Sequence, residues 1–240
     1  MGVQQVMDEF ADVVKTLRGE QGCPWDRKQT HDSLRPCAME EAAELAAAIR
    51  IYQKTGDPEN MKEELGDLLL QVVMHAQIAE EEGLFTLEEV IREIHEKMIR
   101  RHPHVFAGEQ ISGEDRLVRW EEIKKKEKEG KSWISSPLRE IPCELPALAR
   151  AAKVIKKADR LYPSEEQKKS SITKLEEAVA QLKNLEAQEV QADQAAMEEC
   201  IGEILWCVSE ISARRGIPQE QVLADRIEDV IDSRETLHFS

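Results

Sequence analysis

The chain has 240 residues and a formal net charge of −15, from 33 lysines and arginines against 48 aspartates and glutamates. This charge opposes nonspecific binding to nucleic acid or to an anionic membrane, so we expect neither as a partner. No apolar run approaches the roughly 20 residues of a membrane span, and the first residues lack a basic-then-apolar secretion signal. The five cysteines form no C-x-x-C pair and are interpreted as reduced thiols. We therefore expect a cytoplasmic protein.

Helix is favoured almost throughout, because alanine, leucine, glutamate and lysine recur while only 4% of residues are aromatic. Apolar residues at helical spacing predict a first helix that ends near Arg18. Glycine and proline then indicate a loop at Gly22–Asp26, and a second helix is predicted from about His31.

A third helix is predicted from Asp57-Pro58, an N-cap followed by proline, to about Glu82. Its buried side is predicted to hold Met61, Leu65, Leu68, Leu69, Val72, Val73 and Ala76. The capping-box pattern Thr86-Leu87-Glu88-Glu89 opens a fourth helix, and Ser112-x-x-Asp115 opens a further one. Four helices with short connections predict an all-α, four-helix-bundle-like domain.

Two acidic clusters lie within the second and third helices: Glu40-Glu41-x-x-Glu44 and Glu63-Glu64-x-x-Asp67. Positions i, i+1 and i+4 share an arc of about 100° on a helix, so each cluster gathers carboxylates on one side. In an antiparallel pair of helices the two clusters can converge. Oxygen ligands of this kind suit Mg²⁺, with Mn²⁺ as the second choice. A solvated helix face is the alternative interpretation.

The fourth helix ends in a basic cluster that contains Lys97, Arg100 and Arg101. Basic residues at a helix C-terminus are favoured by the helix dipole alone. Beside a metal-binding acidic cluster, however, arginine and lysine are also the residues that bind a polyphosphate. Two tryptophans allow two interpretations each: Trp25 covers the core or binds a ligand, and Trp120 stacks on a nucleobase or seals the core.

Residues 131–146 are predicted to be a linker, because prolines and serines cluster there. Helices are predicted again over 148–161, from the cap Ser164-x-x-Gln167 to about Ala187, over 193–214, and after Pro218. We therefore expect two domains, residues 1–130 and 147–240.

The two halves match at an offset of 136 positions, which predicts an internal repeat. The offset places Glu41 on Glu177 and Gly66 on Gly202. The second copy has not kept the acidic set: Glu44 becomes Ala180, Glu64 becomes Cys200, and Asp67 becomes the longer Glu203. After a four-residue shortening, the positive charges of Lys97 and Arg101 are replaced by Asp229 and Ser233. The second half is predicted to keep the fold without the site.

The first half resembles the MazG nucleoside triphosphate pyrophosphohydrolases, all-α enzymes marked by EExxE followed by ExxD. Here these motifs are Glu40-Glu41-x-x-Glu44 and Glu64-Leu65-Gly66-Asp67. The blocks around them are also similar: residues 22–26, 29–31, 100–106 and 120–124. The resemblance is close over residues 1 to about 157 and weak beyond them.

The resemblance implies Mg²⁺-dependent hydrolysis of a nucleoside triphosphate to the monophosphate and pyrophosphate. It implies metal ligation by Glu41, Glu44, Glu64 and Asp67, with Glu40 ligating or orienting the attacking water. It implies phosphate binding by Lys97 and Arg101, supported by Arg100, and a nucleotide site lined by Trp120 and Lys124, with Trp25 closing over the base.

A homodimer or larger homo-oligomer is also implied, because sites in this family form where bundles from two chains meet. Residues 147–240 are then a degenerate second domain with a role in oligomerisation or regulation. The rival hypotheses are a nucleotide-binding regulatory protein with little or no turnover, and a purely structural helical scaffold.

Overall fold

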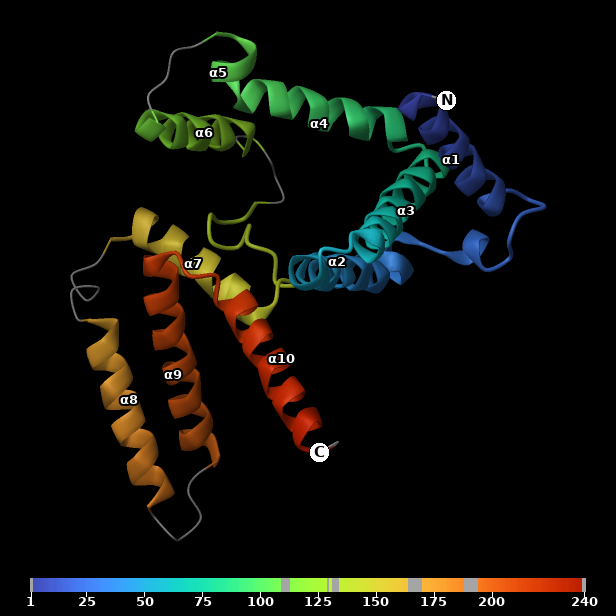
Figure 1. The fold of residues 1–240 in the computed structure, drawn as a ribbon. Coiled ribbons are helices and arrows are strands. Elements are labelled where there is room, and N and C mark those ends of the chain that lie inside the picture. The colour runs from blue at the N-terminus through green and yellow to red at the C-terminus, as the bar shows by residue number, and fades with distance from the viewer. Residues whose placement is uncertain are drawn as a thin grey trace. The chain divides into compact units, whose positions relative to one another are not determined.

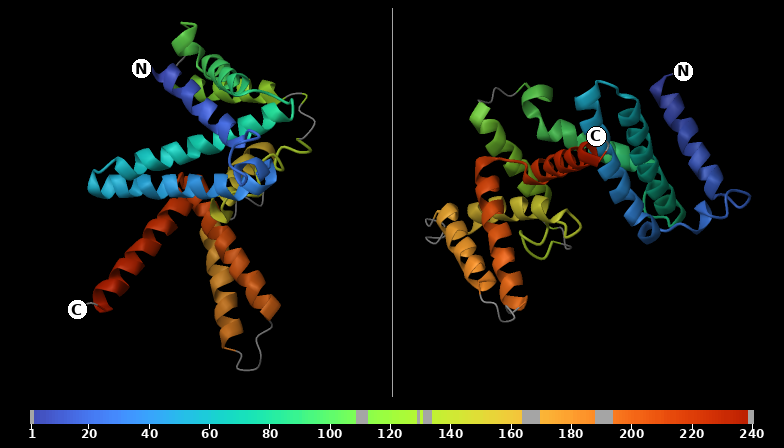
Figure 2. Two further views of the ribbon diagram at one scale, coloured as in Figure 1. Left: turned by 90° about the vertical axis from the view of Figure 1, so that its right-hand side faces the viewer. Right: turned by 60° about the horizontal axis from the view of Figure 1, so that its bottom comes forward.

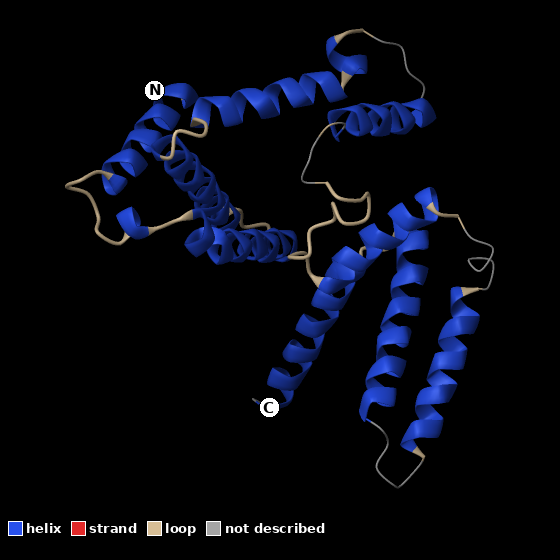
Figure 3. Ribbon diagram, turned by 180° about the vertical axis from the view of Figure 1, so that it is seen from behind, coloured by secondary structure: helices blue, strands red, loops and turns tan. Residues whose placement is uncertain are grey.

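The structure, a computed structural model, describes residues 2–108, 113–128, 130, 134–163, 170–187 and 194–238. Every regular element in these residues is a helix, and none of them lies in a strand (Figure 1 and Figure 3). The prediction of an all-α fold is confirmed. The chain divides into two compact units, residues 1–129 and 130–240.

The first unit contains six α-helices and one short 3-10 helix within the described residues. In chain order they are α1 (Val3–Arg18), η1 (Asp26–Lys28), α2 (His31–Thr55), α3 (Glu59–Glu81), α4 (Leu87–Arg101), α5 (Pro103–Phe106) and α6 (Gly113–Lys128). The predicted end of the first helix and start of the second are confirmed. The elements η1 and α5 were not predicted, since three or four residues show no periodicity. Ser112, predicted to cap α6, lies outside the described residues.

The turn between α2 and α3 is short because both helix ends are capped locally. The helix α2 ends at Gly56, whose φ of 77° is a left-handed conformation that glycine adopts without strain. The Asp57 carboxylate then accepts the backbone N–H of Glu59 at 3.0 Å. The Asp57 side chain accepts a backbone donor of the first turn, but the predicted positions are one residue too early: Pro58 is the N-cap and the helix starts at Glu59. As a result α2 and α3 run antiparallel, side by side (Figure 2).

Two further helix starts carry capping boxes. At α2 the Thr30 hydroxyl accepts the N–H of Ser33 at 3.1 Å, and the Ser33 hydroxyl accepts the N–H of Thr30 at 2.9 Å. At α4 the Glu89 carboxylate accepts the N–H of Thr86 at 2.8 Å, which confirms the predicted capping box. These reciprocal bonds satisfy backbone donors that a helix start otherwise leaves open.

The core of the first unit lies between α1, α2 and α3. Its buried side chains are Val14, Leu34, Val73, Met74 and Ile78. The predicted buried side of α3 is partly wrong: Leu65, Leu69 and Val72 are 51%, 41% and 43% exposed. The periodicity marked the apolar face correctly, but the described part of this chain covers only half of it. An apolar stripe of three residues therefore faces outward on α3.

One arginine fixes the loop between α1 and α2. The Arg18 side chain, 5% exposed, pairs with Glu81 at the end of α3, with Nε and Nη2 donating at 2.9 Å and 2.7 Å. Its Nη1 donates to the carbonyls of Asp26 and Gln29 at 2.6 Å and 3.2 Å. Hydrogen bonds to a charged group are stronger than neutral ones. The loop that carries Trp25 is therefore held to the end of the α2–α3 pair.

The second unit contains α7 (Ala147–Leu161), α8 (Ser171–Glu186), α9 (Gln194–Arg215) and α10 (Gln219–His238). The predicted helices over 148–161, 193–214 and after Pro218 are confirmed to within a residue. The predicted cap Ser164-x-x-Gln167 lies outside the described residues. The helix α8 itself begins later, after Ser170, whose hydroxyl accepts the N–H of Ile172 at 3.3 Å.

A polar network ties the helices of the second unit together. Arg214 on α9 donates to Asp159 of α7 at 3.0 Å and to the Ser171 hydroxyl of α8 at 2.7 Å. The Ser171 hydroxyl donates in turn to Glu210 at 3.1 Å. Ser171 and Glu210 are buried, whereas the side chains of Arg214 and Asp159 are about one-third exposed. Each charged group of the network has an opposite charge beside it. Within the described residues no helix is long and apolar enough to cross a membrane.

Candidate functional site

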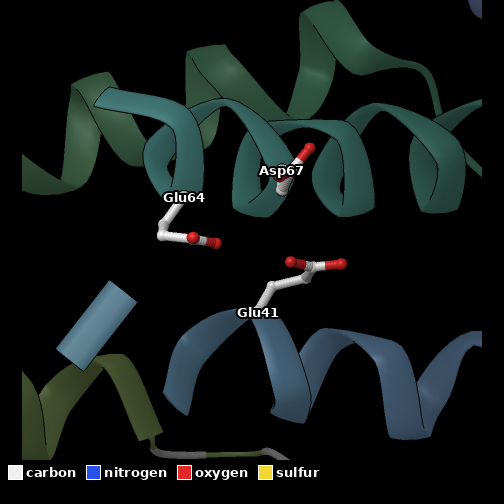
Figure 4. Close-up of side chains that lie close together, drawn as sticks. All are labelled: Glu41, Glu64 and Asp67. Atoms are coloured by element: carbon white, nitrogen blue, oxygen red, sulfur yellow. The ribbon is translucent and has the colours of Figure 1, made fainter. Parts of the chain in front are cut away.

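Three carboxylates converge between α2 and α3. One oxygen each of Glu41, Glu64 and Asp67 lies within 4.8 Å of the other two (Figure 4). Glu41 comes from α2, while Glu64 and Asp67 come from the facing side of α3. They are called the carboxylate triad below. The antiparallel pairing that follows from the capped turn is what brings residues 23 and 26 positions apart together.

The electrostatics of the triad are unfavourable for three bare negative charges. The pKa of Glu41 is raised, first by partial burial and then by the negative charges of Asp67, Glu44 and Glu64. A hydrogen bond from Gln71 acts in the opposite direction. The charged groups that shift this pKa in the described part of the chain are thus all carboxylates. A cation between them would remove the repulsion.

Two amide side chains on α3 support the triad. The Asn60 amide donates to Glu64 at 2.8 Å. Gln71, 8% exposed, donates to Glu41, and its amide oxygen is buried without a hydrogen-bond partner. Neither residue was predicted from the sequence. The signal was available, since Asn60, Glu64, Asp67 and Gln71 follow each other at intervals of four, three and four positions on one helix face.

The donor set fits a hard divalent cation. All three groups of the triad offer carboxylate oxygen, and no described sulfur or imidazole joins the cluster. Mg²⁺ and Mn²⁺ prefer such oxygen ligands, whereas zinc sites favour cysteine and histidine.

The remaining predicted acidic residues surround the triad. Glu44 lies one turn after Glu41 on α2 and acts on the pKa of Glu41 through its charge. Glu40 is exposed beside Glu41, and Glu63 is exposed beside Glu64. The structure thus joins three of the four predicted metal ligands in one group, with the fourth within electrostatic reach.

The predicted phosphate-binding residues form a separate group at the end of α4. Lys97 pairs with Glu93 one turn earlier at 3.6 Å. Arg100 and Arg101, together called the arginine pair, both bind Glu127 of α6, at 2.9 Å and 2.5 Å. Glu127 was not selected from the sequence, although it lies on the same face of α6 as Lys124, three positions earlier.

The two tryptophans differ in their surroundings. Trp120 of α6 is half-buried, with the Arg101 guanidinium 5.6 Å and the Lys124 ammonium 4.1 Å from its ring centroid. The contact with Arg101 joins Trp120 to the arginine pair. Trp25, in the loop fixed by Arg18, is 63% exposed. It does not cover the core of the first unit.

Comparison with known proteins shows which family this chain is similar to. A model of the MazG nucleotide pyrophosphohydrolase domain matches residues 29–106, which include both helices of the triad. The chain is 40% identical over 218 residues to the nucleoside triphosphate pyrophosphohydrolase/pyrophosphatase MazG of Thermotoga maritima, covering 91% of this chain and 80% of that protein.

Two other relatives differ in how much of their own length is matched. The nucleoside triphosphate pyrophosphohydrolase of Escherichia coli K12 is 36% identical over 219 residues, 90% of this chain and 81% of that protein. The uncharacterized protein YabN of Bacillus subtilis is 51% identical over 148 residues, 61% of this chain but 29% of that protein. The likeness to the Thermotoga maritima and Escherichia coli proteins therefore extends through both units.

Proposed function

The chain belongs to the MazG nucleotide pyrophosphohydrolase family, and we propose that it hydrolyses nucleoside triphosphates to nucleoside monophosphates and pyrophosphate. The observation that carries the proposal is the convergence of Glu41, Glu64 and Asp67 within 4.8 Å, in a family whose relatives bear this activity in their names. Housecleaning of the nucleotide pool is the physiological role that we infer.

Four carboxylates would hold the divalent cation: Glu41, Glu44, Glu64 and Asp67. When bound, Mg²⁺ supplies positive charge that offsets the charge of the phosphates and lowers the pKa of water. Mn²⁺ is expected to substitute. Glu40, exposed one position before Glu41, ligates or orients the attacking water. The Asn60 and Gln71 amides hold the Glu64 and Glu41 carboxylates in the orientation that faces the cation.

The substrate phosphates are bound by Lys97, Arg100 and Arg101. Arginine offers two parallel donors to phosphate oxygens, and lysine adds a point charge. Trp120 and Lys124 line the nucleotide site next to Arg101, and their cation–π contact supports that placement. Trp25 closes over the base, and its exposure on a firmly held loop supports this role.

A homodimer or larger homo-oligomer completes the proposal. Exposed apolar stripes on α3 (Leu65, Leu69, Val72) and α4 (Ile91, Ile94, Met98) are supporting observations, because apolar surface of this kind gains from association. The five cysteines are all free thiols, which agrees with a cytoplasmic protein. The charge of −15 argues against nucleic acid as a partner.

Residues 1–130 form the catalytic domain in this proposal, and residues 147–240 form a degenerate copy that follows the linker 131–146. At the position of Glu64 the copy carries Cys200, whose thiol donates to the Ala178 carbonyl at 3.1 Å. A role in oligomerisation or regulation is left for this copy.

The proposal is tested with a panel of nucleoside and deoxynucleoside triphosphates in Mg²⁺, with products followed over time. Pyrophosphate and the monophosphate are expected as the first products. Orthophosphate as the first product would contradict the proposal. A protein that binds nucleotide with no turnover in Mg²⁺ or Mn²⁺ would instead indicate a regulatory role.

A further inference from the structure

A single carboxylate occupies both arginines of the proposed phosphate site. Glu127 of α6 is 12% exposed at its side chain, and its two oxygens divide the arginine pair between them. The Oε1 atom accepts from Arg100 Nε at 3.0 Å and lies 2.9 Å from Arg100 Nη2. The Oε2 atom accepts from Arg101 Nε at 3.0 Å and from Arg101 Nη2 at 2.5 Å.

Glu127 binds each guanidinium along an edge that a phosphate can also use. In both arginines it is the Nε–Nη2 edge, where two N–H groups point the same way and can bind two oxygens of one anion. A phosphate that takes either arginine along this edge competes directly with the carboxylate. The two contacts cannot coexist, because the donors are the same atoms.

Charge and burial also make Glu127 a strong competitor. The two arginines, Arg101 first, hold the pKa of the Glu127 carboxyl below its ordinary range, so this group is ionised at neutral pH. Arg101 is itself only 18% exposed, which limits how far its guanidinium can swing to an alternative partner. An ionised carboxylate that stayed in place would also repel an incoming polyphosphate.

We propose that Glu127 is a built-in competitor of the substrate: it occupies the arginine pair in the free enzyme, and the polyphosphate of the nucleotide displaces it. This inference rests on the proposed function, since it takes the arginine pair as the phosphate site. Glu127 acts through the two arginines and is therefore an affinity-determining residue, not a catalytic one. Glu127 lowers the affinity of the arginine pair for every polyphosphate. A weakly charged ligand does not displace it.

The test uses the isosteric variant Glu127→Gln in the full chain. Glu122→Gln is the matched control, because it removes the same charge from the same helix, where Glu122 faces Arg119 at 3.5 Å instead of the arginine pair. Binding of inorganic tripolyphosphate is measured by isothermal titration calorimetry. KM and kcat are measured by pyrophosphate release from a nucleoside triphosphate in Mg²⁺.

Glu127→Gln is expected to bind tripolyphosphate about three- to tenfold more tightly and to lower KM by a similar factor, with kcat changed less than about twofold. Glu122→Gln is expected to match the wild type in all three quantities. The direction separates this role from a structural one: if Glu127 only held the arginines in position, its loss would weaken binding.

Unchanged or weaker tripolyphosphate binding by Glu127→Gln would overturn the inference. If that variant unfolds at a lower temperature than the control, tripolyphosphate binding is measured with Glu127→Asp instead. Its shorter side chain still carries the charge but reaches the two arginines less well. It is then expected to bind tripolyphosphate more tightly than the wild type. A wild type that binds tripolyphosphate but releases no pyrophosphate would refute the proposed function and leave the calorimetric test intact.

Discussion

The two units contain the same pair of antiparallel helices, α2–α3 in the first and α8–α9 in the second, with different residues on the facing sides (Figure 2). The face of α3 carries Asn60, Glu64, Asp67 and Gln71. At the matching positions of α9 stand Ala196, Cys200, Glu203 and Cys207. On this helix both the proposed ligands and the amides that orient them differ between the units, whereas Glu41 of α2 is matched by Glu177 of α8.

On α9 two of the matching positions carry cysteine in place of a polar residue. Cys200 and Cys207 are buried and behave as small apolar residues with weak donors: Cys200 to the Ala178 carbonyl, and Cys207 to Glu203 at 3.6 Å. Burial and the charge of Glu203 raise the pKa of Cys207, so its thiol stays neutral. The α8–α9 pair thus packs without this set of polar side chains. That face in the first unit needs a functional explanation.

A second likeness lies outside the helix pairs. Each unit has a buried or half-buried arginine side chain that joins several elements: Arg18 binds Glu81 and the loop carbonyls, and Arg214 binds Asp159, Ser171 and Glu210. These arginines do not occupy matching positions of the repeat. The units therefore share the helix pair but not the position of this arginine.

The largest effect is expected from giving the first unit the residue of the second at one triad position. Glu64→Cys should lower kcat in Mg²⁺ about 100-fold or more, because a hard cation loses a carboxylate ligand and gains a thiol that suits it poorly. Pyrophosphate release measures it. Glu63→Cys, one position earlier and exposed, is the matched control and should stay near the wild type.

An intermediate effect is expected from the supporting amide. Gln71→Leu removes the hydrogen bond to Glu41 and should raise the Mg²⁺ concentration for half-maximal activity about tenfold. The buried and unpartnered oxygen of Gln71 is also lost, so the variant should remain as stable as the wild type in the absence of metal. An unchanged Mg²⁺ requirement would show that Gln71 is a packing residue only.

A smaller effect concerns stability. Mg²⁺ at about 100 times its Kd should raise the free energy of unfolding of the wild type by about 2.7 kcal/mol. Asp67→Asn should lose most of this gain. Without metal it should be at least as stable as the wild type, because the charge of Asp67 raises the pKa of Glu41 and thus disfavours the ionised pair. Thermal unfolding with and without Mg²⁺ gives both values.

The smallest effect is expected from loss of the ion pair between Arg18 and Glu81. The pKa of Glu81 is lowered, chiefly by the hydrogen bond from Arg18, so its stabilising contribution is present above the ordinary carboxyl pKa and is lost as pH falls through the lowered value. Glu81→Gln should cost at most about 1 kcal/mol at neutral pH, since the pair is partly exposed. Its melting temperature should then fall less steeply than that of the wild type below about pH 5. Parallel curves would contradict the assignment.

The sequence predicted the helices of this chain well because their ends are encoded locally. The capping box at the start of α4 joins Thr86 and Glu89, and the hydrogen bond at the start of α3 joins Asp57 and Glu59. In both cases the partners lie within three positions of each other. It predicted burial less well: Leu65, Leu69 and Val72 were expected inside and lie exposed. Helical periodicity identifies an apolar face, but what covers that face depends on other elements or another chain.

The site was predictable where its residues share one helix face and less so where elements meet. The triad followed from the acidic spacing and an antiparallel pair. Asn60 and Gln71 are neutral residues on that same face and were missed, since amides are common on helices. The contact of Glu127 with the arginine pair joins residues 26 positions apart across α4 and α6, and no local pattern encodes it.

We expect catalysis to reside in the first unit alone, and one pair of variants tests this most directly. Glu41→Gln and Glu177→Gln remove the same charge from matching positions of the two helix pairs. Pyrophosphate release by the full chain in Mg²⁺ should fall about 100-fold or more in Glu41→Gln and stay within about twofold of the wild type in Glu177→Gln. Equal losses in both variants, or full activity in Glu41→Gln, would contradict the account.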